Sequence, residues 1–307
     1  MKTIEALVNP FGKLESDSPD NIEPVCEVDD AVRRAINDDP SVVLTPAQIN
    51  IYLKYLPEKQ KEDWFPSKYL SDLVQSSYKN GGYNNFVIDL EQYSPPALFR
   101  FISGSKKRPL EIKVIGNVGD AFGISAEYCN FKIEGNGDET FCSGCENCNI
   151  EVTGDVGHSS ALHAKHCTYK IGGNAGHNFG MYSSNNTFDI KGEVGAQFGE
   201  GSKRCTVNIG GDVTSLCGQC SHDSVYHIKG QAGVGVGSGS DKTKFYLGEV
   251  EKSDNNNYRC DVLSFKGRKS TFITSNWDSY WELRRQLKPT EHKLKFDYWN
   301  WLKRKLK

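Results

Sequence analysis

Apolar and polar residues alternate in short segments through the middle of the chain. Around residue 132, for example, Phe131 and Ile133 flank Lys132, and a glycine follows shortly afterwards. Apolar residues at a period of two predict a strand with one buried face. We expect the residues between them to point outward, and most are polar: Lys113, Lys132, Glu151, Lys170, Asp189, Asn208 and His227.

The strand pattern recurs with a fixed period of nineteen. The glycine that closes each segment marks the period, and an eighth glycine, Gly248, comes one position early after the evenly spaced series Gly116, Gly135, Gly154, Gly173, Gly192, Gly211 and Gly230. We number each unit from this glycine, as position 0. Such a unit is too short for a strand, a helix and their loops. The repeat therefore predicts a mainly β fold, a parallel β-solenoid of seven to eight coils spaced ~4.8 Å apart.

A longer glycine phrase supports this interpretation. Gly116-x-x-Gly119-x-x-Phe122-Gly123 recurs at residues 173–180 and 192–199. The phrase resembles the GxxGxxxG repeat of the C-terminal domain of the glutamate synthase large subunit, and it is similar to the repeat found in one of the subunits of formylmethanofuran dehydrogenase. The resemblance covers residues 111–252 and implies a right-handed β-helix. It also implies an architectural role that holds catalytic domains or subunits together. The chain departs from the phrase, and irregular coils are expected, at Asp138, Cys142, Ala161 and Thr214.

The flanks are expected to cover the open ends of the solenoid. Residues 1–110 predict an N-terminal helical cap, with helices over 27–38, 45–56 and 66–78 and strands over 86–90 and 98–102. Residues 253–307 predict a basic C-terminal cap, with a strand within 262–273 and helices over 277–287 and 290–305. Thr45 and Pro46 are typical of an N-cap and a first helical position.

Composition excludes some classes of protein and leaves others open. The chain has 307 residues, 25% of them charged and 37% hydrophobic. It has no apolar run long enough to cross a bilayer, so no membrane span is predicted. The first residues lack the apolar stretch of a secretory signal. Ten cysteines without such a signal indicate reduced thiols, and we expect a cytoplasmic protein.

Charge is distributed unevenly, with a balance of −3 over residues 1–110, −6 over 111–252 and +7 over 253–307. The basic tail could meet nucleic acid, an acidic partner protein, or the acidic body of the chain itself. Alternatively, its last helix packs on the rod with solvated lysines.

The cysteines form a column at position 13 of the units, occupied by small side chains: Cys129, Cys148, Cys167, Asn186, Cys205, Ser224 and Thr243. Buried packing of small residues is the simpler interpretation. Cys142, Cys145 and Cys148 also have the spacing of zinc or iron–sulfur ligands. Cys217 and Cys220 have the spacing of a redox pair, without the strand and helix context that such a pair needs.

A second column, at position 4, places Asp120, Glu139, His158 and His177 on neighbouring coils. Two imidazoles and carboxylates ~5–10 Å apart could bind a divalent cation. The alternative is a solvent-exposed corner whose side chains point into water. Phosphate binding by the glycine turns is disfavoured, because each turn leads into a strand and not into a helix N-terminus.

The sequence therefore favours a non-catalytic scaffold or protein-interaction subunit of a larger assembly, without a cofactor. The alternative is an enzyme with a site on the β-helix surface, either metal-dependent through the position 4 column or acyl-transferring. The period of nineteen, against a coil of three hexapeptides, disfavours the acyltransferase.

Overall fold

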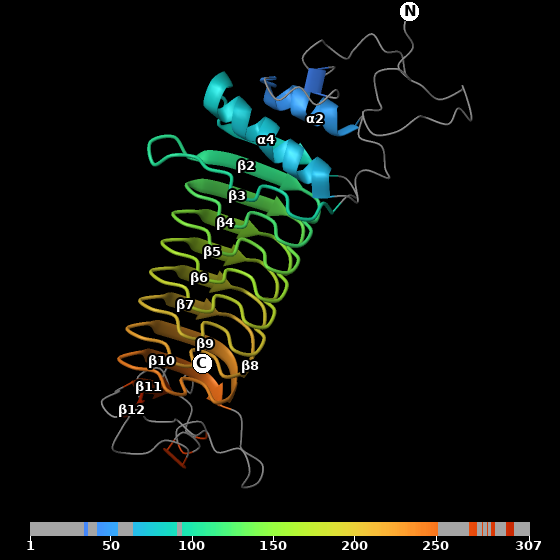
Figure 1. Ribbon diagram of the computed structural model, residues 1–307. Coiled ribbons are helices and arrows are strands. Elements are labelled where there is room, and N and C mark those ends of the chain that lie inside the picture. Colours follow the sequence, from blue (N-terminus) through green and yellow to red (C-terminus); the bar gives the residue numbers. More distant parts are fainter. Residues whose placement is uncertain are drawn as a thin grey trace, which may run out of the picture.

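The computed structural model describes residues 34–35, 42–54, 64–90, 94–250, 270–274, 278, 281, 284–285 and 293–297. These residues form a parallel β-solenoid of about eight turns with two helices packed at its N-terminal end (Figure 1). The helices are α2 (Pro46–Lys54) and α4 (Trp64–Gly81). The strands are β1 (Asn85–Asp89), β2 (Leu110–Ile115), β3 (Cys129–Glu134), β4 (Asn149–Val152), β5 (Thr168–Ile171), β6 (Thr187–Ile190), β7 (Thr206–Ile209), β8 (Val213–Ser215), β9 (Val225–Val234), β10 (Lys244–Val250), β11 (Thr271–Thr274) and β12 (Lys293–Phe296).

The strands stack in chain order into one parallel sheet, with β8 paired beside the main path. The repeat sets the register, since Ile133 pairs with Val152 and Ile190 with Ile209. Two further columns of single bridges complete each coil, at position 2 (Val156 with Ala175) and at position 11 (Lys165 with Ser184). Each coil therefore has three sides, and the predicted solenoid is confirmed.

Stacked apolar side chains fill the interior. Phe179 lies on Phe198 with ring centroids 5.6 Å apart, and Tyr169 lies on Phe188 at 5.3 Å. All four rings are fully buried. Since one strand cannot bury its face alone, this interior exists only because each coil is covered by the next.

The corner between positions 5 and 9 has an unusual backbone, because alternate residues have positive φ. In one coil these are Ser159, Ala161 and His163, with φ between 54° and 55°. Two different constraints therefore explain the glycines of the repeated phrase. At position 7 the left-handed conformation favours glycine, as at Gly180 with φ 69°. At position 0 a side chain would collide with the preceding coil, as at Gly211, where a Cβ would lie 2.7 Å from the carbonyl carbon of Gly192.

The departures from the phrase have different outcomes. Cys142 and Ala161 keep the left-handed conformation, with φ 48° and 55°, and their coils stay in register, so the irregular coils expected there are wrong. The coil does change at Thr214, where β8 replaces a single bridge and β9 lengthens to 10 residues.

The sheet extends beyond residues 111–252 on both sides. β1 pairs with β2 before this range, while β11 and β12 continue the sheet after it. The predicted helices at 45–56 and 66–78 are confirmed by α2 and α4. Arg34 and Ala35 are helical, and the other residues of the helix expected over 27–38 lie outside the described part.

Two predicted elements are wrong. The segment 98–102 is a corner and not a strand, because Phe99 and Phe101 have φ of 58° and 59°. The apolar residues of this segment did not distinguish the two, since the corner also buries Leu98, Phe99 and Ile102 in the interior. A helix was expected over 290–305, but residues 293–296 form β12. There Leu294 pairs with Phe272 and continues the interior column of the sheet. Residues 298–307 lie outside the described part.

Candidate functional site: side-chain columns and two hollows

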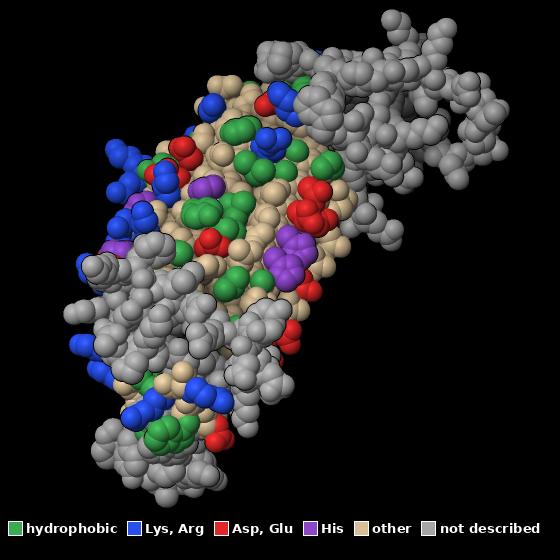
Figure 2. Space-filling view, turned by 60° about the horizontal axis from the view of Figure 1, so that its bottom comes forward, with side chains coloured by type: hydrophobic (Ala, Val, Ile, Leu, Met, Phe, Trp, Pro, Cys, Tyr) green, Lys and Arg blue, Asp and Glu red, His purple; other side chains and the backbone are tan. Residues whose placement is uncertain are grey.

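The two histidines of the position 4 column lie on one edge of the rod, in contact with each other. Their rings stack with centroids 4.8 Å apart and an interplanar angle of 12°. Figure 2 shows a pair of histidines (purple) beside Asp and Glu side chains (red) on this edge. The Nδ1 atom of His158 accepts the backbone N–H of His177 at 2.9 Å, and the Nδ1 atom of His177 accepts that of Ala196 at 2.8 Å. Both side chains thus join one coil to the next.

This geometry determines what the histidines can do chemically. A neutral imidazole whose Nδ1 accepts a hydrogen bond carries its proton on Nε2, so neither nitrogen is open to a metal ion. Stacked parallel rings also direct their lone pairs side by side and not toward one point. Asp120 has the same use as the histidines, since its Oδ1 accepts the N–H of Glu139 at 3.2 Å. Across the described residues, no group of three or more His, Cys, Asp or Glu side chains is arranged to hold a metal ion.

Position 1 carries a column of amides and carboxylates that the repeat pattern alone did not predict. Asn117 accepts the N–H of Asn136 at 2.9 Å, and the same bond is repeated along the rod by Asn136, Asp155, Asn174 and Asp212. The residue type that could have revealed this column is the second residue of the phrase Gly-Asn-Val-Gly. The side chain of that residue supplies one oxygen to a backbone N–H of the next coil.

The cysteine column at position 13 forms hydrogen bonds in addition to packing. The Sγ atoms of Cys148 and Cys167 each accept a backbone N–H from the preceding coil at 3.4 Å. Asn186, Ser224 and Thr243 accept the equivalent N–H with an oxygen. Thiol, hydroxyl and amide are interchangeable here because each offers a small acceptor at the same place.

The trio Cys142, Cys145 and Cys148 is buried inside one coil. Burial raises the pKa of the Cys142 thiol, while hydrogen bonds from its two neighbours lower the pKa of Cys145. The Cys145 thiol donates to the carbonyl of Gly123 at 3.1 Å. In the CxxC pair, burial raises the pKa of Cys217, whereas Cys220 is exposed. All eight described cysteines are free thiols.

A histidine that contacts two carboxylates near the C-terminal coils was not singled out from the sequence. The Nδ1 atom of His222 lies 2.8 Å from the Oδ2 atom of Asp223, and its Nε2 atom lies 3.1 Å from the Oδ2 atom of Asp241 on the next coil. When doubly protonated, this ring joins two carboxylates across the coil boundary.

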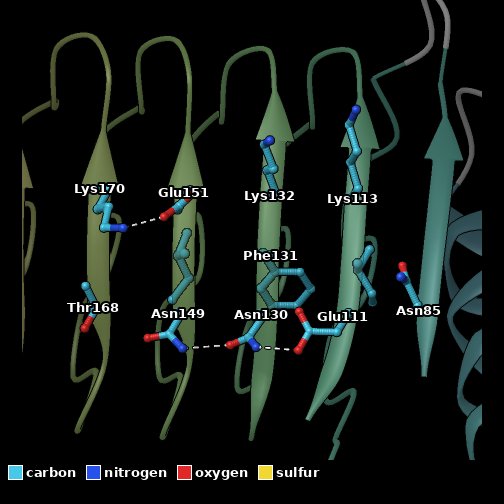
Figure 3. Close-up of a pocket in the computed structure, with 12 residues that line it drawn as sticks. Asn85, Glu111, Lys113, Asn130, Phe131, Lys132, Asn149, Glu151, Thr168 and Lys170 are labelled. Atoms are coloured by element: carbon cyan, nitrogen blue, oxygen red, sulfur yellow. Dashed lines mark hydrogen bonds and ion pairs between the residues drawn. The ribbon is translucent and has the colours of Figure 1, made fainter.

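The outer face of the sheet contains a hollow of about 760 Å³ over β1 to β5. Figure 3 shows its two rows of side chains. One row is a chain of hydrogen bonds, in which Asn149 donates to Asn130 and Asn130 donates to Glu111. In the other row, Lys170 pairs with Glu151 at 2.5 Å. These polar groups already have partners, so the hollow offers a ligand few open contacts.

A smaller groove of about 350 Å³ lies between α4 and the first coil. Its lining combines polar side chains of α4 with the apolar side chains of Ala97, Phe101 and Ile102, and with Arg100. Phe101 is 68% exposed.

Comparisons with known proteins give no relative of this chain. No family model, no curated protein and no solved structure matches it.

Proposed function

We propose that this protein is a non-catalytic scaffold, a protein-interaction subunit of a larger assembly. One observation carries the proposal: the side chains best suited to chemistry are used to join the coils. His158 and His177 each accept a backbone N–H through Nδ1, and the cysteines of position 13 form bonds of the same kind. The resemblance to GxxGxxxG β-helices, which implies an architectural role, supports the same proposal.

The charge of one edge of the rod favours a protein partner over nucleic acid. We define the acidic edge as positions 0–5 of the six units from Gly116 to Leu216. It contains no Lys or Arg and carries the carboxylates Asp120, Asp138, Glu139, Asp155, Glu193 and Asp212. Such an edge repels polyanions and attracts a basic protein surface.

We also propose a cytoplasmic location. The described helices include none that is long and apolar enough to span a membrane. The thiols of position 13 accept and donate hydrogen bonds in their reduced form, and they keep that form in a reducing compartment.

The test is to purify the tagged full-length chain from its native cells under mild conditions and to identify the proteins that co-elute. The complex is then rebuilt from separately purified components, and its stoichiometry is measured by sedimentation velocity. We expect a complex of fixed composition that includes this chain.

Charge-reversal variants provide the control. Glu193→Lys places a cation on the acidic edge, whereas Asp189→Lys makes the same change on the outer face of the sheet. If a partner binds the acidic edge, the first variant weakens the complex more than the second. The proposal would be contradicted if the purified chain bound none of the co-eluting proteins at micromolar concentration. It would also be contradicted if the chain turned over a substrate by itself.

A further inference from the structure

We infer that the groove between α4 and the first coil binds a peptide segment of a partner protein, one that presents an apolar side chain flanked by carboxylates. The inference rests on the proposed function as an interaction subunit and specifies one of its docking sites.

The groove is preformed, because hydrogen bonds hold its two walls together. The α4 wall presents Lys68, Ser71, Asp72 and Gln75, which share one face of the helix. The Ser71 hydroxyl accepts the N–H of Phe99 at 2.9 Å. The Gln75 side chain accepts the N–H of Ser103 at 2.7 Å and donates to its carbonyl at 3.0 Å. The volume lies at the lower end of the range of ligand pockets, which suits a side chain and its neighbours.

Phe101 projects into water from a fixed backbone. It is the most exposed of the described large hydrophobic residues. Its N–H donates to the carbonyl of Ile124, and its equivalents on the next coils, Ser125 and Gly144, form the same type of bond. Serine and glycine at these equivalent positions indicate that the coil does not need the ring. A partner seated in the groove would bury this exposed ring, as the aromatic anchors of binding hot spots are buried.

The charges at the groove determine the chemistry of the segment. The Arg100 guanidinium lies 5.3 Å from the centroid of the Phe101 ring, and no carboxylate within the described segments forms an ion pair with it. Lys68 is paired with Asp72 at 2.6 Å, so Arg100 gives the lining a net charge of +1. A carboxylate beside the apolar anchor would accept bonds from Arg100 while the anchor packs on Phe101.

The experiment measures binding of a fluorescent peptide, Glu-Glu-Phe-Glu-Glu, to the full-length protein by anisotropy. We expect Phe101→Ser to weaken binding at least tenfold, and Arg100→Gln to weaken it and reduce its salt dependence. Tyr182→Ser is the matched control, because Tyr182 is an exposed aromatic residue at the position equivalent to Phe101 on a distant coil. This variant should bind as the wild type does. Serine at residue 125 shows that the coil accepts the substitution, and the urea midpoint of each variant checks the fold.

Peptides in which alanine replaces phenylalanine, or lysine replaces glutamate, test the anchor and the charge separately. We expect both to bind at least tenfold more weakly. No binding at millimolar peptide, equal binding of the lysine peptide, or equal affinity of Phe101→Ser would overturn the inference. If a stoichiometric partner then still binds Phe101→Ser as tightly as the wild type, the scaffold proposal stands without this groove. If the peptide binds as expected but no stoichiometric partner exists, the scaffold proposal fails and the groove remains.

Discussion

Side chains on the corners of this solenoid take over part of the backbone hydrogen bonding between coils. Asp120, Asn136 and His158 differ in charge and size, yet each presents one acceptor atom to an N–H of the next coil. A backbone donor near the surface can be satisfied by any side chain that places a lone pair at that point. Chemically distinct residues are therefore equivalent within one column, as Asp120 and His158 are at position 4 and Asn136 and Asp155 are at position 1.

This equivalence predicts the result of replacing His177. His177→Phe keeps an aromatic ring stacked on His158 but removes the acceptor for the N–H of Ala196. We expect the free energy of unfolding to fall by about 1 kcal/mol, the usual contribution of one hydrogen bond. His177→Asn restores an acceptor and should recover most of the loss, as measured by urea denaturation. Equal stability of the two variants would show that the hydrogen bond does not matter.

A different histidine predicts a pH dependence of stability. Burial lowers the pKa of His227, whose ring stacks on Tyr246 at 4.4 Å. The folded state therefore favours the neutral ring. As pH falls through the ordinary histidine pKa of 6.5, the unfolded state takes up a proton that the folded state resists. The contribution of the neutral His227 ring to the free energy of unfolding should be fully present above this pH and should be lost as the pH falls below it.

The comparison variant is His227→Phe, which keeps the stacking and removes the titration. Its urea midpoint should fall less than that of the wild type between pH 7.5 and pH 5.5. If both proteins lose the same stability over that interval, His227 is not the cause.

At the scale of one coil, the glycine columns differ in how well they tolerate an added side chain. A Cβ at Gly211 would lie 2.7 Å from the backbone of Gly192, where neither coil can move independently. We expect Gly211→Ala to lower the free energy of unfolding by about 3 kcal/mol. A Cβ at Gly180 would meet the far edge of the Phe188 ring at 3.0 Å, and alanine already occupies this column at Ala161.

Gly180→Ala should therefore cost only about 1 kcal/mol, mainly for its left-handed backbone. Thermal or urea unfolding of the two variants side by side tests the difference. The reverse order would mean that left-handed geometry, and not crowding between coils, determines where glycine is required.

The elements that the sequence predicted best are those whose signal repeats. Ile133, Val152 and Ile171 recur at one spacing, and a chance pattern does not recur seven times. The segment 98–102 occurs once, and its apolar residues fit either a strand or a left-handed corner. β12 was missed because Leu294 and Phe296 have polar neighbours at both helical and strand spacings, and only contact with β11 decides between them.

The sequence predicted where the candidate side chains lie, but not the hydrogen bonds that they form. The column of His158 and His177 was correctly placed on neighbouring coils, because spacing determines register. The direction of a ring nitrogen is not encoded in spacing. The groove at Phe101 was not predicted at all, since it requires α4 to pack against a corner that lies well beyond it in the chain.

At the scale of the whole molecule, the length of the rod is adjustable in units of one coil. Deleting residues 173–191 joins Gly172 to Gly192 and leaves every column in register, with His158 now facing the N–H of Ala196. We expect this variant to fold cooperatively, with a urea m-value lower in proportion to the buried area. Deleting residues 173–190 instead shifts each later column by one position and exposes the interior face of the remaining strands.

Circular dichroism and urea unfolding distinguish the two deletions. Loss of folding in both would mean that particular coils, and not their periodicity, hold the rod together.

The stacking of coils also has a mechanical consequence. A force applied to the two ends of the rod peels backbone from the terminal coil first, because each inner coil is held on both faces. Every coil that detaches frees one repeat unit, or roughly 65 Å of extended chain, in exchange for ~4.8 Å of rod. Under tension this protein would lengthen in steps of equal length and would dissipate mechanical work at each step.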